Sequence, residues 1–436
     1  MIRDWERPPR SSARLQAVPP RGGWGRSALI WVLAGLYPFH RVLEGLRVSV
    51  SLGDGVVALI AVIVVFNLAA ASVPVPRYAK QAAALLAAIA TSLTVNAFLP
   101  SHFFSLRDAL IEGLKFLGVA SWMIAVFWLV CDDFPRRYVQ WSVVSIAIAT
   151  GFAIWTVVEN VALRVARPSG PFENPNIYAN YLGLNAFLAL ALSRLLAENW
   201  AGGTSLTRRG LQRLRTLLPV AILPTLVLGM LSTGSRGGLL GFLVGLAVTV
   251  PWRMPRLNVR RAATFVVTTL VLGGALFWFF ERQPFLVNRV AAVTATDPNV
   301  AQRVVLWRAA RHAFYAHPVF GIGYGQFPAY ARHDEGLFAT ESHQTYLSAG
   351  AELGILGLGA LLWLLLSVIR DAWRASVGTG STVTRAFCGF VVATAVQGFF
   401  TNVDQFRSLW IVFGLAAASI RYLSTTRSAH HAAPAP

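Results

Sequence analysis

A glycine-rich turn between two apolar blocks carries the clearest candidate for binding an anion. The segment 232–238 reads STGSRGG and contains Arg236. Its glycines permit close backbone approach, and the amides exposed where the next helix starts favour negative charge. The planar guanidinium of Arg236 matches the geometry of phosphate oxygens. An interfacial arginine that extends toward lipid headgroups is the alternative, and the segment by itself does not separate the two.

A second turn, 170–176 (GPFENPN), stands directly before another apolar block. Its amide side chains, Asn174 and Asn176, are candidates for hydrogen bonding to a substrate. Asparagine is also a preferred N-cap residue of helices. We therefore expect at least one of the two to cap the helix that follows.

The third candidate region combines a glycine-rich, aromatic stretch at 317–327 (HPVFGIGYGQF) with a histidine at 343. The stretch is suited to form a tight wall with aromatic sides for a sugar, and Tyr324 is its candidate contact. His343 precedes an apolar block. A helix N-terminus disfavours imidazolium and keeps the ring neutral, so His343 is a candidate general base. An interfacial or capping histidine is the commoner role.

Residue patterns for metal or cofactor chemistry are missing from the sequence. It contains no phosphate-binding loop, dinucleotide fingerprint, His-Glu-x-x-His or paired-cysteine site. Asp132 and Asp133 are adjacent, but Arg136 and Arg137 follow them, which favours a solvated helix end. We therefore expect no metal and no cofactor.

Composition indicates which elements must position these residues. Of the 436 residues, 55% are hydrophobic and 13% are charged, about half the charged fraction of a soluble domain. The apolar residues form long blocks, each about long enough to cross a bilayer. The formal net charge is +19, but the arginines concentrate between blocks, as the positive-inside rule requires, so we expect no nucleic acid partner.

We predict an all-α polytopic membrane protein with about 12 transmembrane helices and one large periplasmic loop containing short helices. The expected organisation is a basic cytoplasmic tail (1–26), helices 1–9 (27–280), the periplasmic loop (281–342), helices 10–12 (343–423) and a cytoplasmic tail (424–436). The apolar blocks lie near 27–39, 53–72, 81–99, 108–131, 140–162, 177–195, 216–233, 237–252, 262–280, 344–369, 386–401 and 407–423. This count leaves the main arginine clusters inside and both termini cytoplasmic, in a bacterial inner membrane.

The loop 281–342 departs from that rule because it is basic although it lies outside. Its arginines include Arg289 and Arg303. The stretch 299–316 has helical periodicity, with Val304, Trp307 and Ala310 close to one face and Arg303 beside it. We expect a short amphipathic helix at the membrane surface there.

Taken together, these segments resemble the O-antigen ligase and polymerase superfamily of bacterial membrane glycosyltransferases. The resemblance covers roughly 170–360, and Gln344 departs from it where the family commonly has asparagine. The segments that carry it are the turn at 170–176, Ser-Arg-Gly at 235–237, Arg-x-x-Leu-Trp at 303–307, His-Pro at 317–318, Gly-Ile-Gly-Tyr-Gly-x-Phe at 321–327, His-x-x-Tyr-Leu at 343–347 and Ala-Glu-Leu-Gly-Ile-Leu-Gly at 351–357.

The resemblance implies transfer of a glycan from an undecaprenyl-diphosphate carrier to an acceptor on the periplasmic face. It implies that Arg236 and Arg303 bind the diphosphate and that His343 acts at the transfer centre. Elementary chemistry agrees, because arginines neutralise a leaving diphosphate without a metal, and a neutral histidine assists deprotonation of a sugar hydroxyl. Metal-independent transfer with inversion is expected, with Asn174, Asn176, Tyr324 and Arg289 as further substrate-binding candidates.

Loop architecture favours one activity within this superfamily. Polymerases tend to have two sizeable periplasmic loops, and protein O-oligosaccharyltransferases tend to carry a C-terminal extension. This sequence shows one such loop, which looks most like O-antigen ligase, with lipid A–core as acceptor; the other two activities remain alternatives. Asp404, in the last outer turn, has two open roles: it orients a catalytic group or pairs with Arg407.

A multi-helix membrane transporter is the alternative from a different class. Transporters tend to show repeated halves, broken helices and ionisable groups near the membrane centre. We find no internal repeat, and the apolar blocks are nearly free of acids, with Glu159 and Glu352 near predicted helix ends. These features favour chemistry at the outer interface over transport.

Overall fold

The structure is a computed structural model that describes residues 23–39, 52–69, 74–99, 101–172, 174–199, 222–250, 298–338 and 341–432. Within these ranges the chain is all-helical, with no strand. The helices are α1 (Gly23–Leu36), α2 (Leu52–Ala69), α3 (Ala79–Phe98), α4 (Leu106–Val130), α5 (Phe134–Val161), α6 (Pro175–Asn199), α8 (Leu223–Ser232), α9 (Arg236–Thr249), α12 (Pro298–Ala316), α13 (Phe327–His333), α14 (Thr345–Thr379), α15 (Thr382–Gln397) and α16 (Arg407–Ala432).

Six of the described helices are long and apolar enough to cross a bilayer, namely α3, α4, α5, α6, α14 and α16. Five shorter apolar helices accompany them. The chain is therefore a multi-pass α-helical membrane protein. Eleven of the predicted apolar blocks overlap a described helix, and the block 262–280 lies outside the described residues. The total of twelve crossings thus stays a prediction.

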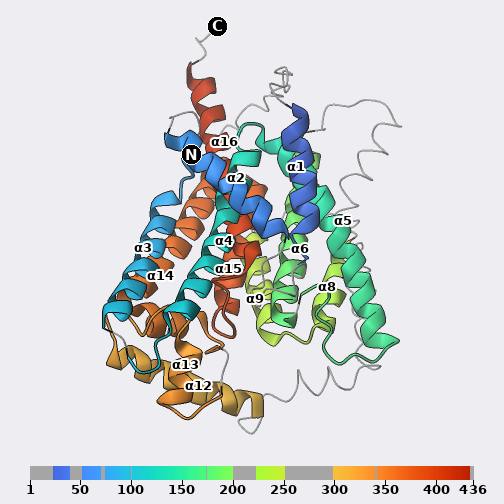
Figure 1. Cartoon of the computed structure of the whole chain (residues 1–436). Helices are drawn as coiled ribbons and strands as arrows, with labels where there is room; N and C mark the ends of the chain where they lie inside the picture. The colour runs from blue at the N-terminus through green and yellow to red at the C-terminus, as the bar shows by residue number, and fades with distance from the viewer. Residues whose placement is uncertain are drawn as a thin grey trace, which may run out of the picture.

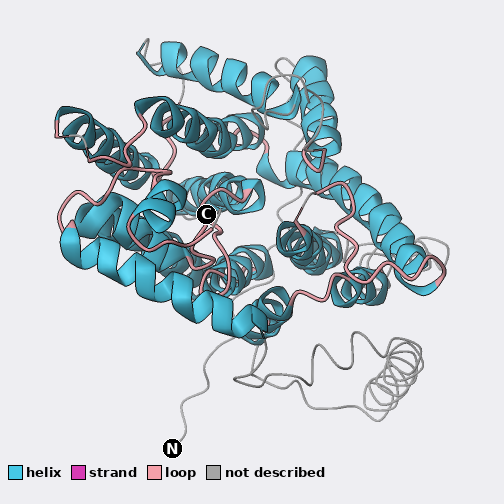
Figure 2. Cartoon of the chain, turned by 60° about the horizontal axis from the view of Figure 1, so that its bottom comes forward, coloured by secondary structure: helices cyan, strands magenta, loops and turns pink. Residues whose placement is uncertain are grey.

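The connections between helices gather at two opposite ends of the bundle (Figure 1). One end carries α12 and α13, and we call it the α12 end. The connections α3–α4, α5–α6, α8–α9 and α15–α16 lie at the same end. The positions of the arginine clusters in the sequence predict that these connections lie together on one side of the membrane. Figure 2, in which the α12 end comes forward, shows the bundle helices joined by short loops there.

The α4–α5 connection lies at the opposite end. Asp132 there pairs with Arg26 and lies 3.8 Å from Arg137, with its side chain 53% exposed. This agrees with the expected solvated helix end.

The helix predicted at 299–316 is present as α12. Its buried face, formed by Leu306, Ala310 and Ala313, belongs to a small apolar cluster with the loop and α13, and the helix packs on α14. Val304 is expected on the apolar face of this helix, but it is 46% exposed. The face that packs is therefore rotated away from Val304.

A break in α14 receives the glycine-rich loop. Gly354 has non-helical φ/ψ angles of 65° and −162° inside α14, and a Cβ there would lie 2.2 Å from the Val319 carbonyl oxygen. The freed backbone groups pair with the loop: Ile322 N donates to the Ala351 carbonyl at 2.9 Å, and Ile355 N donates to the Pro318 carbonyl at 2.8 Å. Backbone polar groups in a membrane require such partners. The predicted wall is therefore fixed to a membrane helix.

Glu352, next to this break, differs from the sequence expectation. It lies within α14 and is 8% exposed, because the loop and α13 cover it. Its Oε1 accepts a hydrogen bond from the Phe327 amide at 3.1 Å.

Close packing of α9 on α15 holds one side of the bundle together. A Cβ at Gly245 would lie 2.2 Å from the Gly389 carbonyl oxygen, and one at Gly241 would lie 2.3 Å from the Ala393 carbonyl oxygen. Small residues allow helix backbones to meet in a membrane, where burial of apolar side chains gives little driving force. The contact fixes the start of α9 beside the end of α15.

Candidate functional site

A cavity of about 350 Å³ at the α12 end contains most of the residues singled out from the sequence. We call it the basic cavity, because Arg167, Arg236 and Arg303 line it and no carboxylate stands among the described residues of its lining. The other lining residues are Asn174, Pro175, Asn176, Gly234, Ser235, Gly237, Val300, Gln302, His343, Gln397, Phe400 and Thr401. Three arginines gathered at one cavity favour the binding of an anion there.

Helix N-termini add to this positive field. The helices α6 and α9 begin at Pro175 and Arg236, which line the basic cavity. The helix α12 begins at Pro298, two residues before the lining residue Val300, and α14 begins two residues after His343. A helix N-terminus carries about half a positive charge and unpaired backbone N–H groups. Helix starts at and near the wall of one cavity therefore favour an anion over a neutral ligand.

The turn before α9 is built to present Arg236. Gly234 has φ +63°, a conformation that favours glycine. The Ser235 hydroxyl caps α9 by accepting from Gly238 N at 3.2 Å, and donates to Asn176 Oδ1 at 2.8 Å. The cap and the cross-link to α6 hold Arg236, the first residue of α9, at the cavity wall.

The start of α6 confirms the expected capping. Asn174 Oδ1 accepts a hydrogen bond from Asn176 N at 2.8 Å, the geometry of an N-cap asparagine. The Asn176 carbonyl also accepts from Gln397 Nε2 at 2.9 Å, while Asn180 Nδ2 donates to Gln397 Oε1 at 2.9 Å. Gln397 thus connects α6 to the end of α15 and fixes the cavity wall between them.

His343 occupies a constrained position beside α14. Its φ is +55°, one of two positive values among the described non-glycine residues, and such values persist where surrounding contacts enforce them. Gln344 caps α14 by accepting from Leu347 N, which gives the departure from the family pattern a structural role. Thr345 holds the helix start to the α15–α16 turn, because its amide donates to the Gly398 carbonyl at 2.8 Å and its hydroxyl to the Thr401 carbonyl at 2.8 Å.

The imidazole of His343 has one carboxylate neighbour. Its Nδ1 lies 2.6 Å from Glu341 Oε1, an ion-pair contact whose alignment is not that of a hydrogen bond. The side chains of His343 and Glu341 are 32% and 28% exposed. The pair leaves Nε2 as the ring nitrogen available to a ligand.

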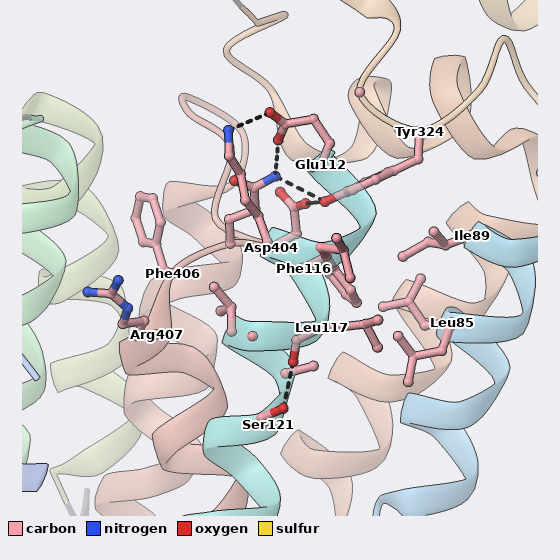
Figure 3. Close-up of a pocket in the computed structure, with 18 of the residues that line it drawn as sticks. Leu85, Ile89, Glu112, Phe116, Leu117, Ser121, Tyr324, Asp404, Phe406 and Arg407 are labelled. Carbon is pink, nitrogen blue, oxygen red and sulfur yellow. Dashed lines mark hydrogen bonds and ion pairs between the residues drawn. The ribbon is translucent and has the colours of Figure 1, made fainter. Parts of the chain in front are cut away.

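A second, larger cavity of about 1010 Å³ adjoins the first. Asn174 and Thr401 line both. Figure 3 shows Glu112, Tyr324 and Asp404 facing one another at one end. Apolar side chains cover most of the remaining wall, and they include Leu85, Ile89, Phe116 and Leu117.

Hydrogen bonds connect the polar end of the large cavity. The Tyr324 hydroxyl donates to Asp404 Oδ2 at 3.2 Å and accepts from Gln405 Nε2 at 3.1 Å. Burial raises the pKa of Asp404 to about 6. Burial, together with the nearby carboxylate of Asp404, raises the pKa of Tyr324 well above its ordinary value, so the phenol remains a hydrogen-bond donor.

The contacts of Asp404 and Arg407 decide between the two roles considered for Asp404. Arg407 pairs with Asp54 of α2 instead of Asp404. Both partners are buried, so the bundle contains an ion pair that the sequence analysis did not anticipate. Asp404 instead lies in the hydrogen-bonded group around Tyr324.

The seven residues selected from the sequence therefore fall in three places. Five of them line the basic cavity: His343, Arg236, Arg303, Asn174 and Asn176. Tyr324 lies in the adjoining large cavity, and Arg289 lies outside the described residues. Among the described residues, no group of three or more histidine, cysteine, aspartate or glutamate side chains is arranged to hold a metal ion.

Sequence reasoning missed several residues of the two cavities. Arg167 is an arginine on a connection predicted to lie outside, the same exception to the positive-inside rule that drew attention to 281–342. That signal was sufficient to find it. Gln302 and Gln397 carried no comparable signal, because glutamine in a helix is common and only packing brings these two to the basic cavity.

Comparison with known proteins supports one family. Residues 220–362 match a family model described as O-Antigen ligase, which confirms the resemblance inferred from the segments. A protein of Rickettsia prowazekii (strain Madrid E) with the name "Putative polysaccharide ligase" is 25% identical over 161 residues. The alignment covers 34% of this chain and 39% of that protein, so the chain spans well under half of its relative's length.

Proposed function

We propose that this chain is an O-antigen ligase, which transfers a glycan from an undecaprenyl-diphosphate carrier to lipid A–core at the periplasmic face of a bacterial inner membrane. The observation that carries the proposal is the basic cavity: Arg167, Arg236 and Arg303 surround it, and His343 stands in its wall. A ligase needs both a site for a diphosphate leaving group and a base for a hydroxyl. The matched family and the name of the relative support polysaccharide ligation.

The proposed reaction is a direct displacement at the anomeric carbon of the donor glycan. The acceptor hydroxyl oxygen forms a bond to that carbon while the bond to the diphosphate oxygen breaks. The diphosphate leaves with the electron pair and remains on its lipid. His343 Nε2 takes the hydroxyl proton. One displacement inverts the anomeric configuration, and no covalent glycosyl-enzyme forms.

Stabilisation of the departing diphosphate is assigned to the arginines and the helix N-termini. Charge accumulates on the leaving oxygens as the bond breaks, and fixed guanidinium groups and backbone N–H groups stabilise such charge without rearranging. We therefore propose that transfer needs no metal. Glu341 holds the imidazole by its Nδ1 side and stabilises it once it is protonated.

Measurement of donor kinetics on a matched pair of variants tests the proposal. Arg303→Ala removes an arginine that lines the basic cavity, whereas Arg308→Ala removes one on the exposed face of α12, away from it. Loss of a charge-assisted hydrogen bond predicts that kcat/KM for the undecaprenyl-diphosphate glycan falls about 10- to 100-fold for Arg303→Ala. For Arg308→Ala, kcat/KM should stay within about twofold of the wild-type value, because an exposed charge contributes little. Addition of EDTA should change neither result.

Three outcomes would contradict the proposal or one of its parts. Equal losses for Arg303→Ala and Arg308→Ala would remove the assignment of the basic cavity to the donor. Lengthening of the glycan on its carrier, with lipid A–core unmodified, would identify a polymerase. Product with retained anomeric configuration would contradict the single displacement.

A further inference from the structure

The two cavities have opposite electrostatic character where they meet. Three arginines line the basic cavity, and the described part of its lining contains no carboxylate. The adjoining end of the large cavity has the carboxylates Glu112, Glu341 and Asp404 in its lining. The cations among the described residues of the large cavity lie beside acids: Lys115 lies 2.6 Å from Glu112, and Arg407 pairs with Asp54. A phosphate is therefore favoured in the basic cavity and disfavoured at this end of the large one.

Hydroxyl groups are the ligands that this polar end suits. Tyr324, Gln405 and Asp404 form a connected set of hydrogen-bond donors and acceptors. Asn402 also lines the cavity, and its Oδ1 has no hydrogen-bond partner among the described residues. Arg407, which is 4% exposed, lines the same cavity with its Nε and Nη1 likewise unpartnered there. A ligand rich in hydroxyls would satisfy such groups, which are costly to leave buried and unpaired.

The rest of the large cavity suits a hydrocarbon chain. Its walls are mainly apolar side chains of α2, α3 and α4. Three of the lining residues, Val62, Leu114 and Leu117, are 51%, 66% and 46% exposed on the side of the bundle. In a membrane protein that side faces lipid. A ligand with a lipid anchor can therefore enter from the bilayer while its sugars reach the polar end.

His343 and Glu341 stand at the border between the cavities. His343 lines the basic cavity, whereas Glu341 lines the large one. We infer that the large cavity is the acceptor site: Tyr324, Asp404 and Gln405 bind hydroxyls of the acceptor saccharide, and the apolar wall holds its lipid. The acceptor hydroxyl reaches His343 from the large cavity, and the donor diphosphate occupies the basic cavity. This inference rests on the proposed ligase function and assigns its two substrates to separate cavities.

Separate titration of the two substrates tests the assignment. Tyr324→Phe removes a hydroxyl from the polar end, and Leu117→Trp fills the apolar part. Tyr330→Phe is the matched control, because the Tyr330 hydroxyl lies 3.4 Å from Glu335 and lines neither cavity. With the full chain in vesicles, we expect the KM for lipid A–core to rise about 3- to 10-fold for Tyr324→Phe, with donor KM within about twofold. Leu117→Trp should act in the same direction, and Tyr330→Phe should change neither KM.

A rise in donor KM instead would place the donor in the large cavity and overturn the inference. Unchanged constants in both cavity variants would overturn it as well. Equilibrium binding of fluorescently labelled lipid A–core separates this inference from the proposed function. If wild type transfers no glycan but binds this probe, and Tyr324→Phe weakens binding about 3- to 10-fold, the acceptor cavity stands and the ligase proposal fails. Absent binding, or equal binding to both proteins, contradicts the acceptor cavity.

Discussion

Glu341 and His343 form a carboxylate–imidazole pair, with 2.6 Å between Glu341 Oε1 and His343 Nδ1, at the border between a basic cavity and a larger, mainly apolar one. The backbone of His343 is held at φ +55°. Since this conformation is costly for a residue with a side chain, contacts around His343 must maintain it. The pair therefore has a fixed direction relative to both cavities.

Because the backbone of His343 is left-handed, a suitable substitution can remove the imidazole ring while the backbone keeps its conformation. Asparagine adopts positive φ more readily than most residues. We predict that His343→Asn keeps the melting temperature of wild type within a few degrees but loses at least about 100-fold in kcat, as removal of a general base does. Retention of kcat in a folded His343→Asn protein would show that the ring is not the base.

Glu341→Gln tests the positioning role of the carboxylate. The substitution keeps the shape of the side chain and removes the charge that stabilises a protonated imidazole. We predict that kcat falls by roughly tenfold while KM for the donor changes little, because the group acts through His343 and not on the diphosphate. Glu335→Gln, at the contact with His312 on the α12 end, is the control. Equal effects of the two substitutions would count against a specific role for Glu341.

Arg167→Ala should weaken donor binding although no sequence motif includes this residue. Arg167 lines the basic cavity and donates from Nε to the Thr233 carbonyl at 3.4 Å. We expect the donor KM to rise about 3- to 30-fold, with little change in the KM for lipid A–core. Arg164→Ala is the control on the same connection, because Arg164 lines neither cavity. If donor KM is unchanged in Arg167→Ala, the basic cavity does not bind the diphosphate through this residue.

Asp404 should make stability depend on pH. Burial raises its folded-state pKa to about 6 from an ordinary value of 3.8. A carboxyl with a raised folded-state pKa stabilises the fold below the unfolded pKa, and this contribution is lost as pH rises through about 6. Over that window, a shift of this size corresponds to about 3 kcal/mol. Asp404→Asn, which still accepts from Tyr324, should therefore unfold at a higher temperature than wild type at pH 7.5 and show a smaller advantage at pH 4.5. The same difference at both values of pH would contradict the prediction.

The contact between α9 and α15 leaves no room for a methyl group. Gly245→Ala would place its Cβ 2.2 Å from the Gly389 carbonyl oxygen, which forces the helices apart. We expect destabilisation by about 1–3 kcal/mol and reduced transfer, because the start of α9 carries Arg236. Gly151→Ala on α5 has no neighbour within 4 Å and should be neutral or slightly stabilising. Thermal unfolding of both variants in detergent distinguishes local packing from a general effect of alanine.

Helix positions and most of the basic cavity could be predicted from the sequence. Apolar blocks mark membrane helices directly, and Arg236, Asn174 and His343 stand on connections that alternation places on one side of the membrane. Sequence order does not reveal which connections meet in space. The large cavity, the Asp54–Arg407 ion pair and the burial of Glu352 depend on helix packing. No local sequence pattern could therefore predict them.

The central claim is that this chain moves a glycan from a lipid diphosphate to lipid A–core, and product analysis of the purified full chain tests it most directly. Wild type and His343→Asn would be incubated with undecaprenyl-diphosphate glycan, lipid A–core and EDTA, and both lipids quantified by mass spectrometry. We predict that wild type alone attaches glycan to lipid A–core and releases one undecaprenyl diphosphate for each glycan transferred. Unmodified lipid A–core after complete incubation of an intact, folded wild type, or equal product from His343→Asn, would contradict the account.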